Sequence, residues 1–291
     1  MKNGRQSTSD YEAVMVCNGH YSLPSVPELP GIDLFDGLVM HSHDYRIPEV
    51  FKNKTVAILG AAASGSDIGL EIATAGGAQQ VYLCHNNPRI PSRLPDNFKQ
   101  KAGIVEIAGP SDVTLQDHST LRNVQVLIFC TGYQYSFPFL DQKVRPQIEN
   151  RVVWPLFKHM IHVDYPKLCF IGIPIQICPF PQFDLQVRCF VKSLTGEIVL
   201  PSRDEMYADT CQELQAKLEA GVPRKHFHKM GADQWDYNRS LCQLARLPLL
   251  PLRVEKLYND VHDFRRKNLV TYKQNNYELN STTGEFCMMT H

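Results

Sequence analysis

The most constraining feature of this 291-residue sequence is a short glycine turn between an apolar strand and a helix. Residues 55–60 read Thr-Val-Ala-Ile-Leu-Gly, an apolar run typical of a buried strand. The turn Gly60-Ala-Ala-Ala-Ser-Gly65 follows at once, and Ile68 and Ile72 then recur at helical spacing. A strand, a glycine turn and a helix in this order predict a parallel α/β unit.

Two further apolar strands extend this unit. They are predicted at 81–85 and 124–130, and the second stops at Thr131-Gly132. Because a parallel strand must return through a right-handed crossover, the fold class is α/β, with a Rossmann-like domain over residues 51–140.

The flanking sequence predicts strands and then helices. A short buried strand is expected at 11–17, and others at 152–157 and 167–173. Beyond 184 the chain is expected to be mostly helical, with helices also at about 232–246 and 252–266, before a loose polar tail of about 20 residues. The apolar faces are predicted to be Val187, Val191 and Leu194 in one helix, and Tyr207, Cys211, Leu214 and Leu218 in the next.

The glycine turn has the chemistry of a pyrophosphate site. A glycine permits the sharp turn, a small residue lets phosphate approach the backbone, and free amides at the positive end of the helix dipole receive the negative charge. Ala62 stands where glycine is preferred, and the alternative is a glycine turn in an α/β domain without a ligand. The predicted cofactor contacts are Gly60, Ala62, Ala63, Ser64, Gly65, Ser66 and Asp67.

The next strand favours NADPH over NADH. It ends in His85-Asn-Asn, with no carboxylate to bind a ribose 2′-hydroxyl. Arg89 and Arg93 follow and would attract a 2′-phosphate, although either arginine could instead belong to a solvated loop.

Composition limits the classes of partner that this chain is expected to bind and the compartment in which it is expected to work. Lys plus Arg and Asp plus Glu each number 30, so the zero formal charge gives no basic field for nucleic acid. Nine cysteines without a Cys-x-x-Cys pair indicate a reducing, cytoplasmic setting. No stretch approaches the roughly 18 apolar residues of a transmembrane helix. The sequence leaves two possibilities open: that a partner attaches the chain to the endoplasmic reticulum, and that the chain forms a homo-oligomer.

Motifs around the turn resemble those of one family. Residues 35–46, with Phe35, Gly37, His41 and Tyr45 in order, resemble the identifying motif of flavin-containing monooxygenases, class B flavoproteins. Residues 129–133 resemble the family's second signature, with Cys in place of Ala. Two further segments, 14–20 and 181–188, resemble other parts of the family, the second with Asp184 where Glu is usual.

The resemblance implies an NADPH domain inserted into an FAD domain. The family uses NADPH to reduce FAD and transfers one oxygen atom of dioxygen to an amine nitrogen or a sulfide of a small molecule, and most of that chemistry belongs to the flavin. No catalytic residue is therefore assigned. By resemblance, His41, Ser42 and Tyr45 lie in the linker between the cofactor domains, Thr131 and Gly132 close the nucleotide unit, and Asn18 and Gln182 approach the flavin or nicotinamide.

Some of these residues have structural alternatives. His41 could hold the linker by hydrogen bonding, and Tyr45 and Tyr133 could simply pack. The remaining histidines lack metal-ligand spacing, so core or solvated positions are favoured over a metal site for His159, His162, His226 and His228.

No second glycine fingerprint, of the kind that binds the FAD pyrophosphate, is found in the sequence. We therefore expect an N-terminally shortened member: 1–50 as a remnant of the FAD domain with the linker, 51–140 as the NADPH domain, and 141–291 as the C-terminal part of the FAD domain. The alternative function is a catalytically inactive NADP-binding or interaction module. A pyridine nucleotide disulfide reductase would need a redox cysteine pair, and a Baeyer–Villiger enzyme would carry Trp-Pro at Tyr45-Arg46.

Overall fold

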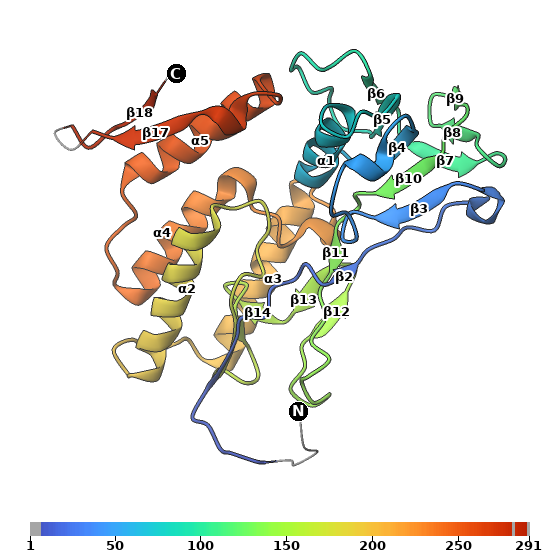
Figure 1. Cartoon of the computed structure of the whole chain (residues 1–291). Helices are drawn as coiled ribbons and strands as arrows, with labels where there is room; N and C mark the ends of the chain where they lie inside the picture. Colours follow the sequence, from blue (N-terminus) through green and yellow to red (C-terminus); the bar gives the residue numbers. More distant parts are fainter. Residues whose placement is uncertain (1–6, 281–282, 290–291) are drawn as a thin grey trace. The chain divides into compact units, whose positions relative to one another are not determined.

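The computed structural model describes residues 7–280 and 283–289 and divides into two compact units (Figure 1). The first, here called the helical unit, comprises Met1–Leu23 and Gln134–Pro251. The second, the sheet unit, comprises Pro24–Tyr133 and Leu252–His291. Residues 24–50 and the segment from Leu252 thus group with the parallel sheet, while the predicted division into FAD and NADPH domains stays a prediction.

A five-stranded parallel sheet forms the centre of the sheet unit. Its order is β3-β10-β4-β5-β6, and every neighbouring pair runs parallel. The predicted strands at 55–60, 81–85 and 124–130 are confirmed. Two others were missed: residues 98–101 are mostly polar, and residues 38–41 were assigned to the motif at 35–46 and not to a strand. The strands are β3 (Leu38–His41), β4 (Thr55–Leu59), β5 (Gln80–Cys84), β6 (Phe98–Lys101) and β10 (Val126–Phe129).

Both faces of this sheet are covered. Val56 and Ile58 of β4 pack in the cluster that includes Ile72 of α1 (Ala63–Ala73). Ala57 points to the other cluster, beneath the small antiparallel sheet of β7 (Ile104–Ile107), β8 (Val113–Leu115) and β9 (Thr120–Leu121). Alternate residues of one strand therefore serve two cores, which explains the unbroken apolar run in the sequence.

The C-terminal segment is ordered where it is described. Helix α5 (Leu252–Lys267) matches the predicted helix at 252–266. The expected loose tail is wrong for residues 276–280 and 283–289, because β17 (Asn276–Leu279) and β18 (Phe286–Met289) form an antiparallel hairpin. Its ladder satisfies backbone groups that composition alone would leave to solvent.

The helical unit combines a small mixed sheet with three helices. The sheet has the order β1-β16-β15-β14, and a separate hairpin pairs β12 with β13. The predicted helix near 232–246 is confirmed as α4. The elements are β1 (Val14–Val16), β12 (Gln147–Glu149), β13 (Val152–Trp154), β14 (Leu156–Phe157), β15 (Ile161–His162), β16 (Leu168–Phe170), α2 (Pro179–Leu194), α3 (Arg203–Glu219) and α4 (Gln234–Ala245).

Short elements make up the remainder. Strands β2 (Leu23–Pro24) and β11 (Tyr133–Gln134) pair with each other. The 3₁₀ turns are η1 (Ile32–Leu34), η2 (Glu49–Phe51), η3 (Arg224–His226), η4 (Gly231–Asp233) and η5 (Tyr272–Gln274). None of the helices in the described part of the chain has the length and apolar character needed to cross a bilayer.

The predicted buried face of α2 is wrong. Val191 and Leu194 are each 43% exposed, whereas Leu185, Cys189 and Phe190 are buried. Gln186 shares that buried face because its amide bonds the Gly172 backbone nitrogen (3.0 Å) and the Tyr237 hydroxyl (2.8 Å). A count of apolar residues alone cannot detect a buried glutamine.

The predicted faces of α3 and the first strand also need correction. In α3 the buried residues are Met206, Thr210 and Leu214, while Tyr207 and Leu218 are exposed. The Thr210 hydroxyl is satisfied by the Met206 carbonyl oxygen at 2.8 Å, which permits its burial. The strand expected to be buried at 11–17 is only Val14–Val16, and of its residues only Val16 is buried.

We expect Ile58→Ala to lower the free energy of unfolding of the sheet unit by about 2–5 kcal/mol, since it opens a cavity at a fully buried position. Val105→Ala, at an exposed position of β7, should change it by about 0.5 kcal/mol or less. Urea titration followed by far-ultraviolet circular dichroism measures both. Equal losses for the two variants would contradict the described packing.

Candidate functional site

The strand order creates a switch point at the carboxyl edge of the parallel sheet. From β4 the chain continues through β5 to β6 on one side, while β10 and β3 lie on the other side. Three predicted site segments meet at this edge because each follows a parallel strand: Gly60 after β4, Thr131 after β10 and Ser42 after β3. In open parallel sheets, ligands bind at this location.

Two glycines make the turn after β4 possible. Gly60 has φ +109°, and a Cβ there would lie 2.5 Å from the Cys130 carbonyl oxygen. A Cβ on Gly65 would lie 1.8 Å from the Gly60 carbonyl oxygen. No side chain fits at either place, so both glycines are needed for the helix to start this close to the sheet.

The start of α1 is open. Ala62 is its N-cap and no side chain caps the helix. Ala62, Ala63 and Ser64 are exposed, so a ligand can approach their backbone. Uncapped amides at the positive end of a helix dipole suit an anion such as a pyrophosphate.

Ser66 and Asp67 use their side chains within the protein. The buried Ser66 hydroxyl donates to the Ala62 carbonyl oxygen (3.0 Å) and accepts from the Arg265 guanidinium (2.9 Å). The Asp67 carboxylate accepts from Arg265 (3.0 Å) and from the Tyr272 hydroxyl (3.1 Å). Their predicted roles in cofactor binding stay predictions, and what the structure shows is that both side chains fasten the C-terminal segment.

His41 is buried at the end of β3. Its Nδ1 accepts a hydrogen bond from the His43 backbone nitrogen at 3.0 Å, and its ring meets the Tyr133 ring edge-on at 5.2 Å. Burial lowers its pKa, partly offset by the Gly132 backbone, so the ring is neutral near pH 7. The structure thus shows a buried ring held by two neighbours, and the role of His41 at the site stays a prediction.

The residues beside His41 join neighbouring segments. The Ser42 backbone nitrogen donates to the Phe129 carbonyl oxygen at 2.8 Å and so prolongs the β3–β10 ladder. The Thr131 hydroxyl donates to the Ser25 carbonyl oxygen, and Gly132 has φ +81°. These contacts set the backbone path at the carboxyl edge.

Tyr45 links the segment after β3 to α1. Its hydroxyl donates to Glu71 Oε2 at 3.0 Å, and its ring stacks on Phe51 at 5.9 Å. Burial, followed by the Glu71 carboxylate, raises its pKa well above the usual value. Tyr45 is thus a protonated packing residue in this structure.

Arg89 and Arg93 are exposed on the loop between β5 and β6. The loop is held by Gln100, whose side chain bonds the Ile90 backbone nitrogen at 2.8 Å and carbonyl oxygen at 3.0 Å. Both arginines therefore belong to a loop that is held by side-chain hydrogen bonds and that follows β5 at the carboxyl edge of the sheet.

Asn18 and Gln182 belong to the helical unit. Asn18 is exposed, with Nδ2 3.5 Å from the Ser136 carbonyl oxygen. Gln182 is fully buried in α2, and neither Oε1 nor Nε2 has a hydrogen-bond partner among the described residues. An unpaired buried amide costs about 1–3 kcal/mol, so Gln182 is suited to receive a further polar partner.

A polar depression of about 750 Å³ lies at the opposite edge of the parallel sheet. Thr55, Gln80 and Gln125 line it, at or next to the starts of their strands. Because ligands of parallel sheets bind at the carboxyl ends, this depression is not favoured as the nucleotide site.

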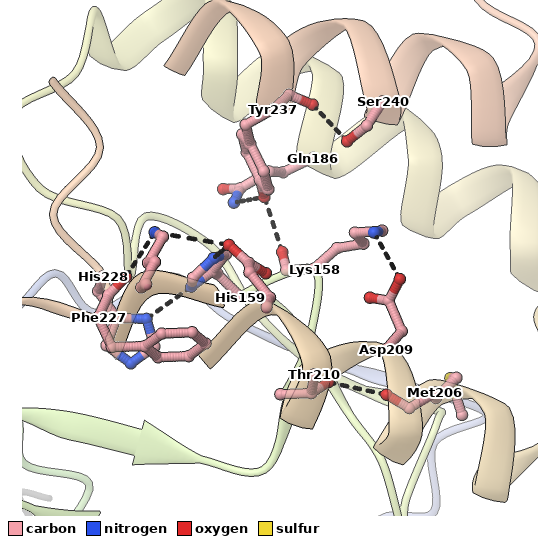
Figure 2. Close-up of polar contacts among 12 residues, drawn as sticks. Lys158, His159, Gln186, Met206, Asp209, Thr210, Phe227, His228, Tyr237 and Ser240 are labelled. Carbon is pink, nitrogen blue, oxygen red and sulfur yellow. Dashed lines mark hydrogen bonds and ion pairs between the residues drawn. The ribbon is translucent and has the colours of Figure 1, made fainter. Parts of the chain in front are cut away.

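Sequence reasoning missed a buried histidine network in the helical unit, shown in Figure 2. His228 Nε2 accepts from the Val153 backbone nitrogen (2.9 Å), so its proton lies on Nδ1 and is donated to His159 Nδ1 (2.8 Å). His159 Nε2 then donates to Glu213 Oε1 (2.8 Å). The same Glu213 oxygen also lies 3.5 Å from Lys217 Nζ.

This network places His159 and His228 in the core, and His162 is buried as well, accepting from the Asp164 backbone nitrogen at 3.1 Å. Within residues 7–280 and 283–289, no group of three His, Cys, Asp or Glu side chains is arranged to hold a metal ion. Burial lowers the pKa of His228 well below its usual value, which keeps the ring neutral.

Glu213 should make a pH-dependent contribution to stability. Burial alone would raise its pKa, but His159 and the nearby lysines outweigh burial and lower it to about 2. Since the folded pKa is depressed, the contribution is complete above the ordinary value of 4.5 and is lost as pH falls toward 2.

We therefore expect Glu213→Ala, which leaves the His159 donor unpaired, to cost roughly 1–3 kcal/mol at pH 7. Glu213→Gln keeps an acceptor and should cost less, with a difference from the unaltered chain that shrinks below pH 4.5. Urea unfolding followed by tryptophan fluorescence reports this, because Trp154 and Trp235 both lie in the helical unit. A pH-independent difference would count against the charged carboxylate.

The parallel sheet, with its helix starting at a glycine turn, defines a Rossmann-like α/β fold. A family described as Flavin-binding monooxygenase-like matches residues 1–97 and 87–247. The chain belongs to this family of oxidoreductases, and its resemblance to flavin-containing monooxygenases is confirmed.

Similar proteins include plant and bacterial members. Flavin-containing monooxygenase FMO GS-OX-like 2 of Arabidopsis thaliana is 37% identical over 84% of this chain and 53% of its own length. The structure of S-allyl-L-cysteine S-oxygenase from Allium sativum is 34% identical, with a TM-score of 0.82 over 90% of this chain and 60% of that one. Tmm from Pelagibacter sp. is 27% identical, with a TM-score of 0.79 over 97% and 62%. The chain spans about half the length of the curated relatives it matches.

Proposed function

We propose that this chain supplies the NADPH-binding unit of a flavin-dependent monooxygenase that oxygenates a soft nucleophile of a small molecule. The observation that carries the proposal is the open turn from Gly60 to Gly65, at the switch point of a parallel sheet in a chain of this family. A pyrophosphate would be bound by the backbone amides of Ala62, Ala63 and Ser64, with the Ser64 hydroxyl as a further donor.

The dinucleotide is NADPH in this proposal. No carboxylate follows β5 where a ribose 2′-hydroxyl would be bound, and the exposed Arg89 and Arg93 offer positive charge to a 2′-phosphate. His41, Ser42, Tyr45, Thr131 and Gly132 shape the backbone around the site.

The helical unit would contribute to FAD binding in this proposal. Gln182 supports this because its buried amide has no partner among the described residues, and Asn18 is exposed and available. FAD supplies the redox chemistry when bound, accepting a hydride from NADPH and activating dioxygen.

A sulfide is the favoured substrate class, with an amine as the second. The Allium sativum relative is named an S-oxygenase, and it covers most of this chain. The alternative function is a catalytically inactive NADP-binding or interaction module.

One experiment separates the two functions. We expect the purified chain to bind NADPH by calorimetry, to show flavin absorbance after addition of FAD, and to convert S-allyl-L-cysteine to a product heavier by one oxygen atom in mass spectrometry. NADPH binding without flavin absorbance or product would favour the inactive module. A folded chain that does not bind NADPH would contradict both.

We expect Ser64→Asp to weaken NADPH binding by at least about tenfold. The new carboxylate lies in the first turn of α1, where it favours the helix dipole and so preserves the fold, but it repels a pyrophosphate. Ser64→Asn, of similar size and uncharged, is the matched control and should remain within about threefold of the unaltered chain. Calorimetry gives the dissociation constants, and equal values for the two variants would contradict this site.

A further inference from the structure

The segment 252–291 is fastened to the candidate nucleotide site although the family model's match ends at residue 247. It contributes α5, η5 and the β17–β18 hairpin to the sheet unit. Three of its residues, Arg265, Leu269 and Tyr272, bond the first two turns of α1 or the loop after β5. We call this segment the C-terminal strap.

The strap's first contact is with the beginning of α1. The Arg265 guanidinium donates to Ser66 Oγ at 2.9 Å and to Asp67 Oδ1 at 3.0 Å. Both side chains of the ion pair are mostly buried, at 22% and 26% exposed, so water screens the pair incompletely. The guanidinium also stacks over the Tyr272 ring, 5.3 Å from its centroid, which fixes its direction.

The strap's second contact is with the arginine-bearing loop. The Leu269 backbone nitrogen donates to Ser92 Oγ at 2.9 Å, and both residues are buried. Ser92 lies between Arg89 and Arg93, so the strap ties that loop to the same segment that holds α1. The two places proposed to receive the pyrophosphate and the 2′-phosphate are thus joined by one piece of chain.

The charges of the side chains in these contacts bear on phosphate binding at the start of α1. Asp67 lies in the second turn of α1, where an unpaired carboxylate would repel a phosphate bound at the helix start. Arg265 pairs with one of its oxygens and Lys273 lies 3.5 Å from the other. Two cations to one anion leave this group of side chains with a positive charge.

We propose that Arg265 is a positioning residue for NADPH, which acts by neutralising Asp67 and thereby keeps the start of α1 attractive to phosphate. The inference rests on the proposed NADPH binding. In this arrangement the Nη2 group of Arg265 bonds Ser66 and Asp67, and its effect on binding comes from offsetting the Asp67 charge rather than from contact with the nucleotide.

The test is a double-mutant cycle on the full chain, with NADPH dissociation constants from calorimetry at about 50 mM salt. We expect Arg265→Ala to weaken binding roughly fivefold to tenfold, because it removes one positive charge near the phosphate and leaves the exposed Lys273 beside Asp67. The double variant Arg265→Ala with Asp67→Asn should bind within about twofold of the unaltered chain, because the charge of this group is then the same as before. Arg265→Lys, which keeps the charge, should restore most of the affinity.

Two controls make the result specific. Arg266→Ala removes the exposed neighbouring arginine and should leave binding within about twofold of the unaltered chain. Raising the salt to about 500 mM should reduce the effect of Arg265→Ala, whereas a loss caused only by loosened structure would not follow salt. Circular dichroism confirms that each variant is folded.

Three results would overturn the inference. Unchanged binding in Arg265→Ala would show that the ion pair has no role, and tighter binding would show that the strap blocks the site. Binding in the double variant as weak as in Arg265→Ala alone would mean that Arg265 does not act by offsetting Asp67. In each case the unaltered chain still binds NADPH, whereas its failure to bind would reject the proposed function, and this inference with it.

Discussion

The close approach of α1 to the turn after β4 is the constraint on which the site depends. A single methyl group on Gly65 would lie 1.8 Å from the Gly60 carbonyl oxygen, so the helix can begin here only because this residue is glycine. That approach leaves the first amides of α1 uncapped and exposed at the carboxyl edge of the sheet. In the proposed function, the pyrophosphate would be bound by backbone amides that this packing leaves exposed.

Neighbouring residues fix the position of this turn and leave its backbone amides accessible. The β3–β10–β4 ladder brings the ends of three parallel strands together, and Tyr45 and Arg265 grip α1 through Glu71 and Asp67. These side chains are engaged within the protein, whereas the backbone at Ala62–Ser64 remains accessible. This separation between side chains bonded within the protein and an accessible backbone suits a family in which the cofactor performs the chemistry and the protein positions it.

Prediction from sequence succeeded where one local pattern decides the structure. The strands at 55–60, 81–85 and 124–130 are apolar on both faces, and the helix near 252–266 has a strong period, so all four were found. It failed where polar side chains are buried by long-range hydrogen bonds. Gln186 on α2 and the His159–His228 pair acquire partners 51 and 69 residues away, and no local pattern shows such partners.

The family, the glycine turn and the absence of a carboxylate after β5 can all be read from residue order, because each depends on residue types at short, fixed spacing. Only the tertiary structure decided that β3 joins the parallel sheet, that His41 is buried and neutral, and that Arg265 reaches Asp67 across 198 residues. The physical reason is that a hydrogen bond or an ion pair between distant segments depends on where folding brings them. The glycine turn, in contrast, depends on a local property, because glycine has no Cβ and so lets two backbone segments come close together.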